Sequence, residues 1–234
     1  MKLNSKVVLS ASLVSLTALL SACGGGEVIV EPTPTTVVTV IAGTVTPWTA
    51  GQTSTIAPAQ NMRPTTTVNG SGNFDLPLPD IATMTSAYSG DLTDGAAFSS
   101  GCGNAVAITP GLKIGVIVDM AVGNIKSTYY TYSSYQGGVL TYTGWWFANT
   151  DGTVTSTNAN CGINAFIGKV TANLSLKAGW NIVNYTQTSS GSGLAYQVST
   201  AAPDNNRRSW RPNPITNSSL SKLSRQANPW GFIN

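Results

Sequence analysis

The sequence predicts an all-β protein, more specifically an antiparallel β-sandwich of about eight to ten short strands. Short segments that alternate apolar and polar residues recur along the chain, and turn signals rich in Gly, Asn and Asp separate them. No segment after residue 22 shows the apolar period of an amphipathic helix. Parallel strands need crossover helices, so we expect the strands to pair antiparallel.

The chain begins with a predicted export signal. Lys2 and Lys6 precede an apolar run over residues 7–20, which is shorter than the roughly 20 residues that a membrane-spanning helix needs. A basic start, a short apolar run and small residues at its end are typical of a signal peptide. We therefore expect residues 1–22 to be removed.

A lipidation motif follows the apolar run. Leu20-Ser21-Ala22-Cys23 resembles the lipobox of bacterial lipoproteins at all four positions. The resemblance implies that Cys23 becomes an acylated N-terminus, carrying palmitate-type chains that anchor it in a membrane. Residues 23–36 contain three glycines and two prolines and are expected to form a flexible tether. In a host with an outer membrane, Gly24 after the cysteine resembles the pattern sorted to that membrane.

The sandwich domain is expected over residues 37–200. Its first strands are predicted at residues 37–45 and 72–79, where Phe74, Leu76 and Leu78 share one face and Pro77 marks a sheet edge. The pairing of Gly43-Thr44-Val45 with the later Gly-x-Phe-x-Leu-x-Leu-Pro segment resembles carboxypeptidase-regulatory-like (prealbumin-like) β-sandwich modules. The resemblance covers residues 41–79 and implies a sandwich.

Later segments follow the same pattern. Residues 80–104 are rich in Ser, Gly and Asp and are expected to form a loop, whereas residues 113–122 are apolar on both faces and predict a central strand. Asp151-Gly152 predicts a hairpin turn. The clearest alternation predicts a half-buried strand at residues 170–177. Further strands are expected in the aromatic stretch 129–147 and at residues 180–185 and 194–198.

The tail, residues 201–234, is basic and rich in proline. We expect it to form an irregular strap rather than a second domain. Its segment Arg207-Arg208-Ser209-Trp210-Arg211 mixes cations with an aromatic ring. Two interpretations stay open: the cations bind an anionic envelope polymer or lipid head groups, or Trp210 and Trp230 dock onto their own domain.

The two cysteines that remain after lipidation, Cys102 and Cys161, form an even pair in an exported chain. They are predicted to form a disulfide. By the loop-entropy relation, closing this loop contributes about 4 kcal/mol.

The chain has no histidine, which excludes Ser-His-Asp and Cys-His catalysis and the common zinc sites. We predict no catalytic residues, no metal site and no cofactor, and therefore no enzyme. Asp91 and Asp94 could supply oxygens to Ca²⁺, but a solvated turn fits the segment better because a calcium loop needs more ligands. Asp119 is either a functional acid or a strand-edge residue that reaches a backbone donor.

The aromatic residues carry the sharper binding hypothesis. Tyr130, Tyr132, Trp145 and Trp146 are candidates for a flat face that stacks on sugar rings of a carbohydrate or of peptidoglycan. Strand alternation points Trp145 and Trp146 to opposite faces. At least half of the aromatic set is therefore expected in the core, and packing remains the alternative to binding.

These observations predict a cell-envelope lipoprotein with a non-catalytic structural or binding module at the cell surface or facing the periplasm. Its expected partners are the membrane through the lipid anchor, and envelope polysaccharide or envelope proteins. Nucleic acid is not expected as a partner, because the basic run is short and the protein is expected to be exported.

Overall fold

A computed structural model of the chain describes residues 37–59, 64–123, 128–163, 166–190, 193–212 and 230. Strands dominate and the helices are short, so the predicted all-β class is confirmed. The predicted signal peptide, Cys23 and the tether lie outside the described residues. Residues 36–234 form one compact unit. No helix in the described part is long and apolar enough to cross a bilayer.

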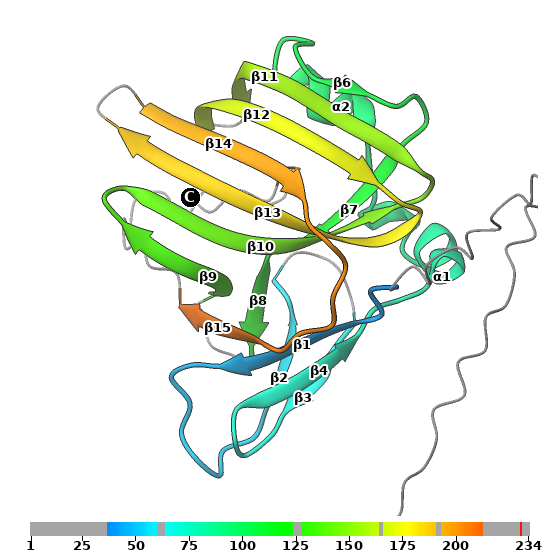
Figure 1. The fold of residues 1–234 in the computed structure, drawn as a ribbon. Helices are drawn as coiled ribbons and strands as arrows, with labels where there is room; N and C mark the ends of the chain where they lie inside the picture. Colours follow the sequence, from blue (N-terminus) through cyan, green and yellow to red (C-terminus); the bar gives the residue numbers. More distant parts are fainter. Residues whose placement is uncertain are drawn as a thin grey trace, which may run out of the picture. The chain divides into compact units, whose positions relative to one another are not determined.

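Short strands and short helices make up the first half of the described unit, and the longer strands lie in the second half (Figure 1). The first half of the unit contains β1 (Val40–Val45), β2 (Ser54–Pro58), β3 (Thr66–Val68), β4 (Asn73–Pro77), α1 (Ile81–Ser86), η1 (Ser89–Asp91), β5 (Thr93–Asp94), α2 (Gly95–Ser100) and β6 (Ala107–Ile108). The second half contains β7 (Lys113–Ile117), β8 (Asp119–Val122), β9 (Thr128–Gln136), β10 (Val139–Ala148), β11 (Gly152–Ile163), β12 (Phe166–Leu176), β13 (Gly179–Ser190), β14 (Gly193–Thr200) and β15 (Arg208–Pro212).

The described strands join one hydrogen-bonded network, whose main path runs β3-β2-β8-β9-β10-β13-β14-β12-β11-β6. Most neighbours are antiparallel, but β12 pairs with β14 in parallel and β1 pairs with β15 in parallel. The strands therefore form a mixed sheet with an apolar cluster on each face, rather than the purely antiparallel pairing of the prediction, and the predicted sandwich is not confirmed. Two-residue strands such as β5 and β6 show no alternation, so the sequence predicts fewer strands than the sheet contains.

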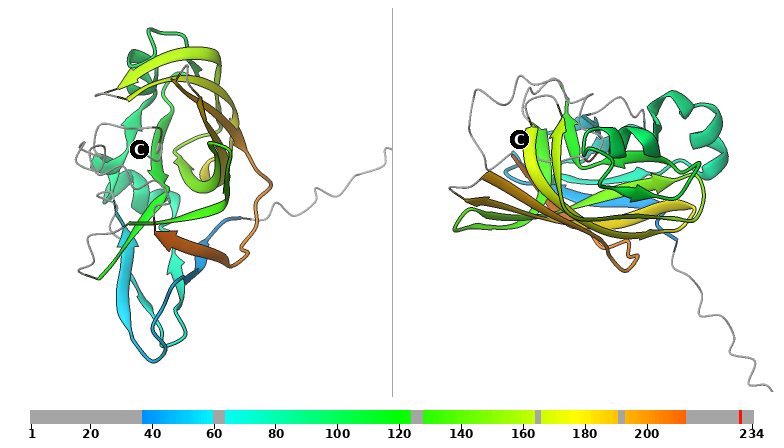
Figure 2. Two further views of the ribbon diagram at one scale, coloured as in Figure 1. Left: turned by 90° about the vertical axis from the view of Figure 1, so that its left-hand side faces the viewer. Right: turned by 90° about the horizontal axis from the view of Figure 1, so that it is seen from above.

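β10 is one of several strands that contribute side chains to both apolar clusters. It pairs with β9, β13 and β7. Tyr142 and Trp146 belong to the cluster that also holds α2, whereas Trp145 and Phe147 belong to the cluster with β1, β4 and β15. The opposite orientation of the adjacent tryptophans follows from strand alternation, as predicted. The β10–β13–β14–β12–β11 part of the sheet curves, and α2 lies on its concave side (Figure 2).

The predicted central strand over residues 113–122 is divided in two. β7 pairs with β10, while β8 pairs with β2 and β9, and Val118 lies between them. Residues 114–120 are buried throughout, which agrees with the apolar character of both faces. Ile114, Val116 and Val118 contribute to one apolar cluster, and Ile117, Met120 and Val122 contribute to the other.

The segment 80–104, expected to be a loop, contains two short helices. Asp80 caps the first turn of α1, because its carboxylate accepts a hydrogen bond from the backbone N–H of Thr83 at 2.8 Å. Hydrogen bonds from Thr83 also lower the pKa of Asp80 below its usual 3.8. α2 buries Phe98 in the apolar cluster that also holds Tyr142 and Trp146, which we call the concave cluster because it lies on the concave side of the curved sheet (Figure 2). Each helix has six residues, too few for an apolar period to appear in the sequence.

The described part of the tail contains a strand, β15, where the prediction had an irregular strap. β15 pairs in parallel with β1 and antiparallel with β9, so it joins these two strands. Trp210 and Trp230 are both fully buried, in different clusters. The docking interpretation of these tryptophans is therefore confirmed.

Candidate functional site

The structure does not gather the four candidate ligand-binding aromatics on an exposed face. Trp145 and Trp146 are 1% and 0% exposed, and Tyr130 is 6% exposed. Only Tyr132 keeps partial exposure. The predicted aromatic binding face is corrected accordingly, and packing is the interpretation that the burial supports.

The physical reason is that the tail covers both tryptophans of β10. Trp210 stacks on Trp145 with 5.6 Å between ring centroids, and Trp230 meets Trp146 edge-on at 6.1 Å. Phe98 of α2 packs against Trp146 at 5.5 Å. Partners supplied from distant parts of the chain thus occupy both faces of β10.

A tyrosine hydroxyl organises the concave cluster. Trp146 Nε1 donates a hydrogen bond to Tyr185 Oη, which in turn donates to the carbonyl of Trp230 at 2.8 Å. Tyr142 stacks on Tyr185 with 4.5 Å between centroids. Burial raises the pKa of Tyr185 well above 10.0. The hydroxyl therefore stays protonated and acts as a fixed link between β10, β13 and residue 230.

Asp119 lies at the break between β7 and β8 and is 3% exposed. The hydroxyl of Tyr130 donates to its Oδ2 at 3.4 Å, and Thr128 donates to Tyr130 Oη at 3.3 Å. The position agrees with the strand-edge interpretation, although this partner is a side-chain hydroxyl rather than a backbone donor. All three side chains are buried, so the carboxylate is held inside the sheet.

Arg207, one of the tail arginines, is engaged with the domain. Its Nη1 donates to the carbonyls of Gly43 and Phe74 at 2.8 and 2.9 Å, and its Nη2 pairs with Asp75 at 2.6 Å. The guanidinium thereby joins the start of β15 to β1 and β4.

Arg208 and Arg211 differ in their contacts. Arg208 pairs with Asp204 at 2.9 Å and lies 5.4 Å from the centroid of the Trp145 ring. Arg211 is exposed, lies 5.8 Å from the Tyr132 centroid and has no ion pair with a described residue. Two of the three arginines of the predicted polymer-binding run are therefore used in internal contacts.

The predicted disulfide between Cys102 and Cys161 is present. It links the segment after α2 to β11, and the adjacent Gly162 N–H donates to the carbonyl of Gly101 at 2.8 Å. Both cysteines belong to the concave cluster. The bond therefore fastens the helical segment to the far edge of the sheet.

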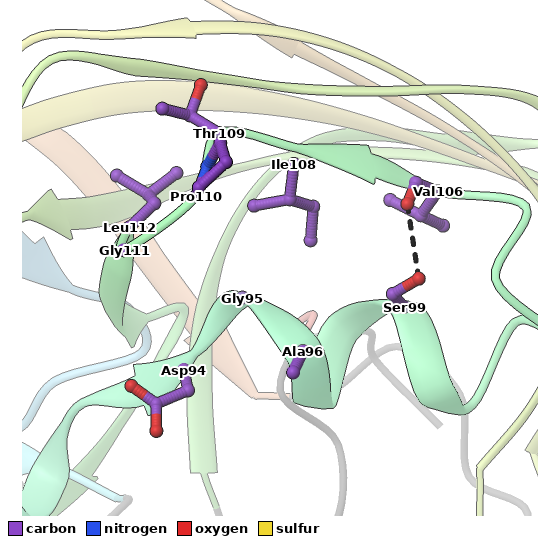
Figure 3. A pocket seen from close by; sticks show the side chains of 10 residues that line it. All are labelled: Asp94, Gly95, Ala96, Ser99, Val106, Ile108, Thr109, Pro110, Gly111 and Leu112. Atoms are coloured by element: carbon purple, nitrogen blue, oxygen red, sulfur yellow. Dashed lines mark hydrogen bonds between the residues drawn. The ribbon is translucent and has the colours of Figure 1, made fainter.

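A shallow cleft of about 460 Å³ lies between α2 and the segment around β6 (Figure 3). Val106, Ile108 and Leu112 supply much of its apolar wall. Its polar groups have protein partners: Ser99 donates to the carbonyl of Val106 at 3.2 Å, and Asp94 lies 3.9 Å from the Lys113 amine. In the described residues, no group of three or more His, Cys, Asp or Glu side chains is placed to hold a metal ion.

A broad exposed surface is formed by the convex side of β10, β13, β14, β12 and β11, which faces the reader in Figure 1. Strand pairing aligns its polar side chains in two rows, which we call the polar rows. The first row is Thr143, Asn184, Ser199, Asn173 and Thr155. The second row is Thr141, Thr186, Gln197 and Thr171. Residues that alternate with them, such as Val183, Tyr196 and Ala172, are buried in the concave cluster.

The sequence predicts part of the polar rows. The alternation at residues 170–177 points Thr171 and Asn173 away from the apolar face, and the structure places both there. Which residues of other strands lie beside them depends on strand order and register, which no local pattern specifies. The parallel pairing of β12 with β14 is the feature of this strand order that is hardest to predict from the sequence.

Comparison of the chain with protein-family models, with curated protein sequences and with solved structures found no match.

Proposed function

We propose that this chain is a lipid-anchored protein of the cell envelope and that its β-domain is a non-catalytic structural or binding module. The lipobox ending at Cys23 and the tether over residues 23–36 support the anchor. The Cys102–Cys161 disulfide fits an oxidising compartment outside the cytoplasm.

The observation that carries the module proposal is the exposed convex surface with the polar rows. The opposite face of the same strands is filled by the concave cluster, α2 and Trp230. A sheet packed on one side and bare on the other offers a rigid surface for contact with other envelope components. Envelope polysaccharide and envelope proteins are the partners of this proposal.

The anchor is tested on the native protein in membranes of its own host. We expect mass spectrometry of the N-terminal peptide to show a cleaved chain that begins at acylated Cys23. We also expect Cys23→Ala to move the protein from the membrane fraction to the soluble fraction, or to leave it as an uncleaved precursor. An unacylated Cys23 in a host with a working lipidation pathway would falsify the proposal.

The module is tested by chemical cross-linking in intact cells followed by purification of the chain. Repeated recovery of the same envelope protein supports a structural role. Recovery of the protein with cell-wall glycan, and without a protein partner, supports a binding role. If neither an envelope protein nor glycan is recovered with a chain that is correctly acylated, the module proposal is contradicted. The proposal of a lipid anchor is not affected by that result.

A further inference from the structure

We propose that the polar rows form a binding surface for a neutral polysaccharide, through hydrogen bonds to its hydroxyl and acetamido groups. The inference deepens the proposed function and rests on it, because an exported and anchored domain is exposed to such polymers. In this proposal the sugar contacts are polar side chains on the convex surface, and not the buried aromatic residues.

The geometry of the surface is that of a regular lattice. Neighbouring strands lie about 4.8 Å apart and alternate residues along a strand about 6.7 Å apart, so the first row spans about 19 Å over its five strands. The pairings β10–β13, β13–β14 and β14–β12 run without a register shift, whereas β9–β10 and β11–β12 each contain one. An even, extended array suits a repeating polymer better than a small molecule, which needs a concave site.

The hydrogen-bonding groups at the centre of the lattice are available. Asn173, Asn184, Gln197 and Ser199 are exposed, and their side chains make no hydrogen bond to another residue in the described part of the chain. Amide and hydroxyl groups act as both donors and acceptors. They can therefore match the mixed donors and acceptors of sugar hydroxyls.

The charge of the surface indicates a neutral partner. The polar rows contain no ionisable side chain, and Lys169 lies beyond their end on β12. Lys177, at the other end of that strand, is paired with Asp151 at 2.8 Å. Nucleic acids and anionic lipids are bound by clusters of cations, and an amphipathic helix needs an apolar groove. The polar rows offer no cluster of cations and no apolar groove. A neutral polysaccharide requires neither of these features.

Such binding is expected to be weak for one domain and strong for many. Each neutral hydrogen bond exchanged with water contributes little net free energy. A lipid-anchored protein presents many copies on one surface, and a polysaccharide presents many repeats, so multivalency raises the effective affinity.

The test uses the full chain, purified in detergent, and its retention on three insoluble or bead-bound polymers: chitin, cellulose and carboxymethyl cellulose. We expect retention on at least one of the two neutral polymers, unchanged by added salt. We expect Thr186→Glu/Gln197→Glu to lower that retention by about tenfold, the factor that corresponds to 1.4 kcal/mol. The reason is that buried carboxylates at the contact lose their hydration.

A matched control makes the same two changes elsewhere. Thr49 and Gln52 are exposed in the loop after β1, so Thr49→Glu/Gln52→Glu should retain wild-type binding. Asn173→Ala/Asn184→Ala gives a milder second variant if the first fails to fold, as judged by circular dichroism. Three outcomes overturn the inference: no retention of folded protein on chitin or cellulose, equal loss in the control, or salt-sensitive retention on carboxymethyl cellulose alone. None of them bears on acylation of Cys23, so failure of the inference is distinguishable from failure of the anchor.

Discussion

Arg207 connects the tail to two strands from the opposite end of the unit through the carbonyls of Gly43 and Phe74. Arg207→Met keeps an apolar stem but removes the donors, leaving both carbonyls without this partner. We expect the free energy of unfolding to fall by about 1–3 kcal/mol, measured by urea titration.

Arg211→Met is the control for this prediction. Arg211 is exposed, and its contacts are the Tyr132 ring and the hydroxyl of Ser209. Its replacement should change stability by about 0.5 kcal/mol or less. Equal losses in the two variants would show that Arg207 has no special role in closing the domain.

Two buried phenols predict a loss of stability in alkali. Burial raises the pKa of Tyr185 and of Tyr196 above 10.0. In the unfolded chain both ionise near pH 10, as free tyrosine does, whereas in the folded chain they stay protonated to higher pH. The folded-state pKa is the higher one, so the stabilisation is complete below about pH 10 and is lost as the pH rises beyond it.

This pH dependence is measured as the urea midpoint at several pH values. We expect it to fall between about pH 10 and pH 11 and to fall less steeply in Tyr196→Phe, which removes one of the two groups. An identical slope in wild type and variant would contradict the role of the buried phenol.

At the level of elements, β1 is confined between β4 and β15. A Cβ at Gly43 would lie 2.5 Å from Trp210 Cδ1 and would also overlap the Phe74 ring. Gly43→Ala therefore forces these strands apart, and we expect a loss of about 1–3 kcal/mol in unfolding free energy. Gly90→Ala is the matched control, because nothing lies within 4 Å of a Cβ there. A loss in both variants alike would argue against tight packing at β1.

The disulfide acts on the element that covers the concave cluster. Cys102→Ala/Cys161→Ala opens a loop with a sequence separation of 59 residues. We expect unfolding free energy to fall by about 2–4 kcal/mol. Hydrogen exchange should quicken in α2 more than in β10, because α2 ends two residues before Cys102 whereas β10 contains neither cysteine. Uniform exchange in both elements would contradict this local effect.

At the scale of the whole molecule, two tryptophans of the tail complete the two apolar clusters. Trp210 belongs to one cluster and Trp230 to the other, and both are 0% exposed. We expect Trp210→Ala and Trp230→Ala each to lower the unfolding free energy by about 3–5 kcal/mol. Trp48→Ala is the control: Trp48 is only half-buried, so we expect a smaller loss of unfolding free energy.

Removal of residues 201–234 tests whether the domain folds without its tail. The shortened chain lacks β15 and both tryptophans, so the β10 rings lose their partners on both faces. We expect it to lose cooperative thermal unfolding, measured by circular dichroism. A shortened chain that unfolds with the wild-type transition would show that the tail is dispensable.

Features that depend on neighbouring residues are predictable from the sequence. The side-chain period of a strand places Val170, Ala172 and Leu174 in the core and points Trp145 and Trp146 apart, as expected. The disulfide was predicted because Cys102 and Cys161 form a pair once Cys23 is assigned to the expected lipidation motif. Six-residue helices and two-residue strands give too short a pattern, which is why α1, α2, β5 and β6 are missed.

Features that depend on distant pairing are not predictable in this way. The same tryptophans that the sequence offers as a binding face are covered by Trp210 and Trp230, which follow them by more than sixty residues. The polar rows combine five strands whose order is set by a parallel pairing of β12 with β14.

By itself the sequence determined the all-β class, the alternation within single strands, the cysteine pair and the expectation of a lipid anchor, because each depends on residue type and short spacing. Only the tertiary structure decided that the tail belongs to the fold, which aromatics are buried and which polar side chains lie in rows. These depend on register and packing between segments far apart in the chain, and their free energy comes from contacts that no local window contains.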